Sequence, residues 1–234
     1  MTTTVLLNNV DHHDLHYLPL HGADYGDAVN QMLLLPTEFE EAQREFPILL
    51  RREEGGGFQA VALLGLDRGE NLFLGHDGWT SRYVPAIQAR GPFAIGGSNG
   101  SAMIHVDLAD PRVTKDKGDP LFLANGGNAP ALEMIVDILA TLHEGAELVA
   151  PLYEAWESLG LIQPAQIAIN VGEGRRYDLA DFSTISEARL ASLTSEELAD
   201  LNRNGFLRPA FLLAASINNV GRLADLKTRK IAED

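Results

Sequence analysis

Two short strings in this sequence hold residue types that can do chemistry. Residues 96–100 (GGSNG) fit the G-x-S-x-G pattern around a hydrolase nucleophile, and His105 with Asp107 forms an H-x-D pair. A nucleophilic serine needs a strand before it and a helix after it, because the helix amino terminus helps to hold the oxyanion. The residues after Ser98 instead alternate between apolar and polar types, which predicts a strand. We therefore interpret Ser98 as part of a tight hairpin turn, since Asn-Gly tolerates the torsions of such turns.

The H-x-D pair can supply half of a non-haem iron site. A facial triad on His105 and Asp107 would need a second histidine, presented by another strand. The one histidine after Asp107 is His143, which lies in a stretch with helical spacing. Because this arrangement is poor for iron, we favour a surface role for His105 and Asp107.

A second histidine cluster, HHDLH, occupies residues 12–16. In a helix, His12 and His16 would lie one turn apart on one face, a spacing that suits a divalent metal. The surrounding residues are typical of an extended segment, so an exposed polar strand is the favoured interpretation. A metal-dependent enzyme that uses His12, His16 or His105 with Asp107 stays open as the alternative hypothesis.

Composition and charge limit the class of protein. The 234 residues are 45% hydrophobic and 22% charged, which indicates one globular domain spanning residues 1–234. The 18 basic and 33 acidic residues give a net charge of -15, which repels nucleic acid and anionic lipid. The absence of cysteine excludes thiolate catalysis and iron–sulfur clusters, and we predict no cofactor.

The sequence also predicts the location of the protein. The longest apolar runs, 60–66 and 210–217, are far shorter than the roughly 20 residues of a membrane-spanning helix. The first residues have neither the basic nor the apolar region of a secretory signal. We therefore expect a soluble, cytoplasmic protein that is not embedded in a membrane.

The spacing of apolar residues changes along the chain and predicts an α+β fold. Residues 1–125 should form a β-rich lobe of antiparallel strands, with strands at 47–53, 58–66 and 71–75. The glycine-rich EEGGG string between the first two is predicted as a hairpin turn. A short helix should follow Pro36, because acidic residues there fall in the first turn, where the helix dipole favours them.

Residues 126–234 should form a mostly helical lobe. Apolar residues recur at helical spacing from 130 to 160, and Gly145 and Pro151 predict either a kinked helix or two helices.

The rest of this lobe carries clear boundary signals. Strands are expected at 165–171 and 175–185, joined by a GEG turn. Thr194 and Glu197 match a capping box, and the last helix is predicted to begin at Pro209, since proline suits a first helical turn.

The segment 71–93 combines aromatic residues with arginine, a mixture found at binding hot spots and ligand pockets. Its members are Phe73, Trp79, Arg82, Tyr83, Arg90 and Phe93. Core packing is the simpler alternative, because large aromatic side chains are mostly buried for stability. If the segment is a binding surface, the candidate residues are Asn71, Trp79, Arg82 and Tyr83. Arg82 would then pair with an anionic group, and the aromatic rings would supply buried area.

Longer strings extend over nearly the whole chain, from about His12 to Leu226. They include FPILLRR, ALLGLDRGENLFLGHDGWTSRYVPA, DPLFLANGGNAPALEMIVDIL and LTSEELADLNRNGFLRPAFLLAASINNVGRLADL. These strings resemble the SapC family of bacterial proteins. The positions that match the family's recurring residues are Pro36, Glu38, Pro47, Asn71, Phe73, Trp79, Tyr83, Pro85 and Phe93. The sequence departs from the family at Gly91, where a tyrosine is usual.

The resemblance implies a soluble bacterial protein and brings no established catalytic residues with it. The family name comes from surface-layer genes, and other members are labelled peptide-transport components. Many lie beside genes for TonB-dependent receptors, flavin-dependent halogenase-like proteins and cupin-like proteins.

Three hypotheses about function follow. We predict a non-enzymatic accessory protein that binds a partner protein or a small ligand in an uptake- or surface-associated system. The alternative is a metal-dependent enzyme of the non-haem iron type, or an oxygenase partner of a halogenase-like protein. A third hypothesis is a homo-oligomer in which segment 71–93 is the interface between copies.

Overall fold

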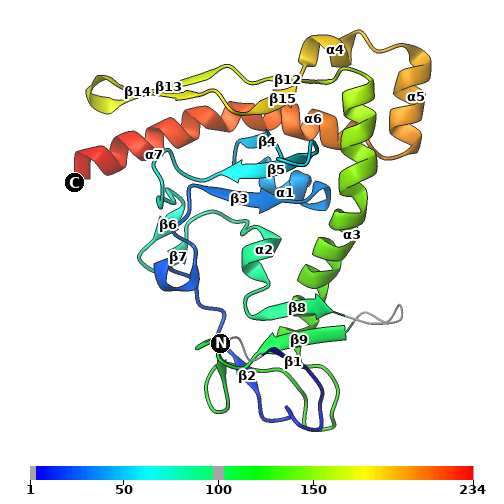
Figure 1. Ribbon diagram of the computed structural model, residues 1–234. Coiled ribbons are helices and arrows are strands. Elements are labelled where there is room, and N and C mark those ends of the chain that lie inside the picture. The colour runs from blue at the N-terminus through cyan, green and yellow to red at the C-terminus, as the bar shows by residue number, and fades with distance from the viewer. Residues whose placement is uncertain (1–3, 97–102, 234) are drawn as a thin grey trace.

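The structure is a computed structural model that describes residues 4–96 and 103–233 (Figure 1). The strands are β1 (Thr4–Leu6), β2 (His16–Tyr17), β3 (Gln31–Leu34), β4 (Ile48–Arg52), β5 (Phe58–Leu63), β6 (Leu74–Gly75), β7 (Gly78–Trp79), β8 (Phe93–Gly96), β9 (Met103–Asp107), β10 (Val113–Thr114), β11 (Asp119–Pro120), β12 (Ile162–Pro164), β13 (Ile167–Val171), β14 (Arg175–Leu179) and β15 (Ser183–Ile185). The helices are α1 (Phe39–Ala42), α2 (Ala86–Ala89), α3 (Pro130–Ser158), α4 (Glu187–Ala191), α5 (Ser195–Arg203), α6 (Leu207–Ser216) and α7 (Val220–Glu233). Short 3-10 turns are η1 (Ala23–Tyr25), η2 (Pro36–Glu38), η3 (Gly172–Gly174) and η4 (Ile217–Asn219).

Antiparallel strands dominate the first half of the chain and long helices the second, which confirms the α+β class. None of the helices in the described ranges is long and apolar enough to cross a membrane.

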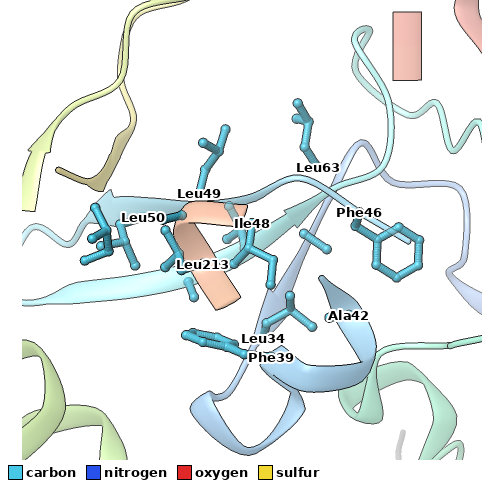
Figure 2. Close-up of a cluster of buried hydrophobic side chains, with 14 of the residues drawn as sticks. Leu34, Phe39, Ala42, Phe46, Ile48, Leu49, Leu50, Leu63 and Leu213 are labelled. Atoms are coloured by element: carbon cyan, nitrogen blue, oxygen red, sulfur yellow. The ribbon is translucent and has the colours of Figure 1, made fainter. Parts of the chain in front are cut away.

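The main sheet has the strand order β12-β15-β4-β5-β3 and holds the larger hydrophobic core. Strand β5 lies between β4 and β3 and is almost entirely buried, which explains its continuous apolar sequence. As predicted, β4 and β5 form a hairpin, and Gly56 supplies a φ of 96° in its turn. Figure 2 shows how side chains from the sheet, α1 and α6 interlock, with Leu34, Phe39, Ala42, Phe46, Ile48, Leu49, Leu50, Leu63 and Leu213 labelled.

A smaller core lies at the other end of the molecule. The sheet β1-β9-β8 packs against the first half of α3 through residues such as Phe93, Val106 and Ile135. The second half of α3 reaches the main core, where Trp156 is fully buried. Figure 1 shows α3 running from the small sheet to the main one. Helix α3 therefore joins both cores.

The region from 130 to 158 is one continuous helix of 29 residues with Pro151 inside it. The sequence had left a kinked helix and two helices open, and the structure excludes two. Gly145 is buried in this helix, and a Cβ there would lie 2.6 Å from Leu35 Cβ and 2.5 Å from Thr37 Oγ1. The glycine thus allows α3 to pass closely over η2.

The predicted strand 175–185 is wrong as a single element. Its first part, β14, pairs with β13, and its last part, β15, pairs with β12. Strand β15 also pairs with β4 through Ser183 and Leu50, so the C-terminal half contributes to the main sheet. Strand β12 follows α3 and was not predicted from the sequence.

The final helix does not begin at Pro209, and it is not continuous. Helix α6 begins at Leu207, and η4 separates it from α7. Asn219 lies in η4 and donates its side-chain amide to the carbonyls of Gln43 and Phe46. These tertiary bonds and the low helix propensity of asparagine explain the interruption. The capping box of Thr194 with Glu197 is confirmed by both of its hydrogen bonds.

Helix α7 is fixed to the loop that follows β5 by a buried cation. Lys227 is only 5% exposed and bonds the carboxylates of Asp67 and Glu70. Burial alone would lower the pKa of Lys227, but its bonds to these carboxylates raise the pKa above the ordinary value. The ammonium therefore stays charged and holds the C-terminal helix in place.

The two helical glycines Gly145 and Gly221 give a matched test of the α3 packing. In both, alanine has a higher helix propensity than glycine by up to about 1 kcal/mol. Gly221→Ala meets no atom within 4 Å and should stabilise the protein by about this amount. Gly145→Ala must displace Leu35 and should destabilise by about 1–3 kcal/mol. Urea unfolding of both variants measures the two free energies, and stabilisation by both would contradict the close approach of α3.

Candidate functional site

Asp27, just before β3, holds the start of the candidate segment in place. Its side chain is fully buried, and Oδ1 accepts a hydrogen bond of 2.8 Å from the Trp79 indole nitrogen. Its backbone carbonyl accepts a bond of 2.9 Å from the Asn71 amide. Oδ2 accepts the Gly22 backbone N–H at 2.5 Å and lies 3.5 Å from His21 Nδ1. One aspartate therefore fixes two of the candidate residues at once.

Asn71 and Trp79 also belong to the edge of the main core. The Asn71 side-chain oxygen accepts the backbone N–H of Phe73 at 2.9 Å. Phe73 is fully buried and packs edge-on against Phe46, and Trp79 packs against the same ring. The side-chain amide of Asn71 therefore both donates and accepts a hydrogen bond within the protein.

Glu38 holds the end of the segment. The side chain is 2% exposed, and Oε1 accepts bonds of 2.7 Å from both the Tyr83 hydroxyl and the Ala86 backbone N–H. Oε2 accepts the Leu35 backbone N–H at 2.8 Å. The sequence had explained this glutamate by the helix dipole of a first turn. The structure gives it another role, as a buried acceptor that joins η2 to the segment.

Burial determines the protonation of this pair. Desolvation raises the pKa of the Glu38 carboxyl, although its three hydrogen bonds act in the opposite direction. Desolvation also raises the pKa of Tyr83, and the nearby Glu38 charge raises it further. Tyr83 is therefore a neutral hydroxyl donor at physiological pH and has no character of a phenolate base.

Arg82 differs from the other three candidate residues. Its side chain is exposed and makes no hydrogen bond or ion pair with any residue in the described ranges. The backbone around it is nevertheless fixed, because Thr80 N–H bonds the Phe73 carbonyl and Ser81 Oγ bonds the Tyr83 carbonyl. The arrangement presents a cation to solvent from a rigid support.

A short hairpin precedes Arg82 in the sequence. Strands β6 and β7 pair through Leu74 with Trp79 and Gly75 with Gly78. At its tip, the side chains of His76 and Asp77 are almost fully exposed. The hairpin therefore projects polar groups next to the anchored residues, on the N-terminal side of Arg82.

The alternative metal site is not assembled in this structure. His12 lies in a turn, where its Nδ1 accepts the Asn8 backbone N–H, and His16 lies in β2. His105 and Asp107 both lie in β9, which pairs antiparallel with β1 in the small sheet. Within residues 4–96 and 103–233, no three His, Asp or Glu side chains are grouped so that they could hold a metal ion.

The predicted N-terminal extended segment around HHDLH forms strands only at its two ends, since β1 covers Thr4–Leu6 and β2 covers His16–Tyr17. The Asn8 side-chain oxygen accepts the backbone N–H groups of Val10 and Asp11. Such a local turn competes with an extended backbone, which explains the correction.

Ser98 and the G-x-S-x-G string lie mostly outside the described residues. The flanking segments β8 and β9 pair antiparallel from Phe93 with Val106 to Gly96 with Met103. The predicted strand after the string is therefore confirmed at Met103–Asp107, where a nucleophile elbow would need a helix.

Gly91 lies against the side chain of Tyr17. Gly91 has a φ of 55°, and a Cβ there would lie 2.6 Å from the Tyr17 hydroxyl. Tyr17 is buried against the edge of Phe93. Its ring thus occupies the space next to residue 91, and a tyrosine at 91 would collide with it.

The fold and the site together define an α+β protein with a surface segment anchored on buried carboxylates. The model of the SapC family matches residues 7–223, so this chain belongs to the SapC family. No curated protein and no solved structure matches the chain.

Loss of the Glu38 carboxylate should destabilise the protein strongly. Glu38→Ala leaves three buried donors without an acceptor, which should cost about 3 kcal/mol or more. Tyr83→Phe removes only one of these donors and keeps the ring, so about 1 kcal/mol is expected. Urea unfolding measures both values, and equal losses in the two variants would contradict the role of Glu38 as a shared acceptor.

The raised pKa of Glu38 predicts a pH dependence. The folded state binds the Glu38 proton more tightly than the unfolded chain, whose pKa is 4.5. The contribution of Glu38 to the free energy of unfolding is therefore fully present below pH 4.5 and is lost as the pH rises through the folded pKa. Glu38→Gln cannot titrate, so the stability of the wild type relative to this variant should fall with rising pH. A difference that stays constant in urea unfolding between about pH 4 and 8 would contradict this.

Proposed function

We propose that this SapC-family protein is a non-enzymatic accessory protein that binds a partner through the segment 71–83. Arg82 contacts an anionic group of the partner, and Asn71, Trp79 and Tyr83 hold the segment in its binding conformation. The family resemblance supports an uptake- or surface-associated system as the setting.

The observation that carries this proposal is the unpaired state of Arg82. Acidic residues outnumber basic ones by 33 to 18, yet Arg82 has no carboxylate partner in the described parts of the chain. An arginine at a fixed position can bind a carboxylate or phosphate in a bidentate manner. Its surroundings are already ordered, so little conformational entropy is lost when a partner binds.

The buried carboxylates support the proposal in a second way. Asp27 fixes Trp79, and Glu38 fixes Tyr83, so the backbone that carries Arg82 is held on both sides. Trp79 and Tyr83 therefore stabilise the fold through internal hydrogen bonds, and the exposed side chains of the segment are the ones that can contact a partner. No comparable set of groups supports the metal-enzyme alternative in the described residues.

Replacement of Arg82 should weaken partner binding without changing stability. We expect Arg82→Ala to lower the recovery of a specific partner by about tenfold, because a charged hydrogen-bonded pair contributes about 1.5–3 kcal/mol. Arg229→Ala is the matched control, since Arg229 is also exposed and has no partner in the described residues. The measurement is quantitative mass spectrometry of proteins captured from cells of the source organism. Capture of the same proteins in the same amounts by wild type and Arg82→Ala would refute the proposal.

A further inference from the structure

A hollow opens between the turn of the β4–β5 hairpin and one face of α3, and it shares no residue with segment 71–83. Figure 1 shows this hairpin beside α3. The volume of the hollow is about 370 Å³, which lies within the range of small-molecule sites. Its lining combines apolar and acidic side chains. The residues are Glu53, Gly56, Gly57, Phe58, Val149, Ala150, Tyr153, Glu154 and Glu157.

The carboxylates of this hollow keep free acceptor oxygens. Glu154 is exposed and forms no hydrogen bond or ion pair with any other described residue. Glu53 accepts the Gln59 amide at 2.8 Å through Oε1, which leaves Oε2 free within the described parts of the chain. Glu157 is neutralised by Arg52 at 2.7 Å. The hollow therefore carries negative charge that the chain itself does not balance.

The spacing of these carboxylates favours an extended cation over a metal ion. Among the residues that the structure describes, no three acidic or histidine side chains are grouped so that they could hold one metal ion. The glutamates of the hollow come from the hairpin turn and from α3, on two sides of the same space. A linear polyamine carries ammonium groups several bonds apart, so it can reach separate carboxylates. Its methylene groups can lie on the apolar wall, where their burial is favourable.

A buried hydroxyl gives a second, independent indication of a ligand. Tyr153 lines the hollow from α3 and is 4% exposed, and its hydroxyl makes no hydrogen bond of normal geometry with any described residue. Burial raises the pKa of this hydroxyl, the nearby Ala60 backbone N–H lowers it, and the charge of Glu53 raises it again. Because Glu53 also lines the hollow, its effect indicates that the hydroxyl lies toward the hollow. The oxygen of this neutral hydroxyl can accept a hydrogen bond from an ammonium group.

We propose that this hollow binds a linear polyamine. The ammonium groups of the polyamine bind the carboxylates of Glu53 and Glu154, and one of them donates a hydrogen bond to the Tyr153 hydroxyl oxygen. The wall already accommodates a cation, since the Arg52 guanidinium lies 4.4 Å from the centroid of the Phe58 ring. The net charge of -15 attracts a polycation at long range, which favours this ligand over an anion or a second copy of the chain.

The test is isothermal titration calorimetry of the full chain with spermidine in about 0.15 M salt, which screens long-range attraction. We expect saturable binding at one site with a dissociation constant of about 1 mM or lower. Glu154→Gln should raise this constant about fivefold, as for loss of an exposed ion pair. Tyr153→Phe keeps the ring and should raise it about tenfold, as for loss of a hydrogen bond to a charged group.

Glu144→Gln is the matched control, because Glu144 is also exposed on α3 and lies outside the hollow. It removes the same charge and should leave the dissociation constant unchanged. Urea unfolding should find Tyr153→Phe as stable as the wild type, since the hydroxyl has no hydrogen-bond partner to lose among the described residues. A clear loss of stability in this variant would contradict a hydroxyl that is free for a ligand.

Three results of the titration would overturn the proposal. One is the absence of saturable binding up to about 10 mM spermidine. The second is equal binding by the wild type, Glu154→Gln and Glu144→Gln. The third is equal displacement of spermidine by the same concentration of magnesium, which would indicate general attraction to an acidic surface. None of these results depends on Arg82 or on the partner proposed for segment 71–83.

Discussion

A carboxyl group removed from water must be surrounded by hydrogen-bond donors, and the arrangement of this molecule depends on how Glu38 meets that constraint. Its donors come from Leu35 and from the stretch that contains Tyr83 and Ala86. Next to Glu38, the Thr37 hydroxyl bonds a carbonyl of α3. The end of β3, the candidate segment and the long helix therefore meet at one point, between the two hydrophobic cores. Loss of the Glu38 carboxyl group would leave its donors without an acceptor.

The same physical principle is used twice more. Asp27 gathers Asn71 and Trp79, and Lys227 joins α7 to Asp67 and Glu70. In each case a buried polar residue connects segments that are distant in sequence. Such connections are specific because a shifted segment would lose its partner, whereas apolar contacts tolerate small shifts. The result is a rigid frame, and segment 71–83 lies on its surface.

The structure changes the interpretation of the four candidate residues Asn71, Trp79, Arg82 and Tyr83. Asn71, Trp79 and Tyr83 are internal donors in the structure, so their role in stability is direct. Any role in binding is then indirect, through the position of Arg82. The sequence grouped these four residues as one unit because they are close in the chain. It gave no signal for Asp27, which lies in an ordinary polar stretch and is brought near by folding.

The sequence by itself determined the α+β class, the β4–β5 hairpin, the helical character of 130–158 and the Thr194 capping box, since local spacing and turn residues control these features. Only the tertiary structure decided that the predicted strand 175–185 divides into β14 and β15, and that η4 interrupts the last helix. Those outcomes depend on long-range partners, such as Leu50 for β15 and the carbonyls that bind Asn219. Likewise, the burial of Glu38 and the exposure of Arg82 follow from what packs against each residue, which no local pattern records.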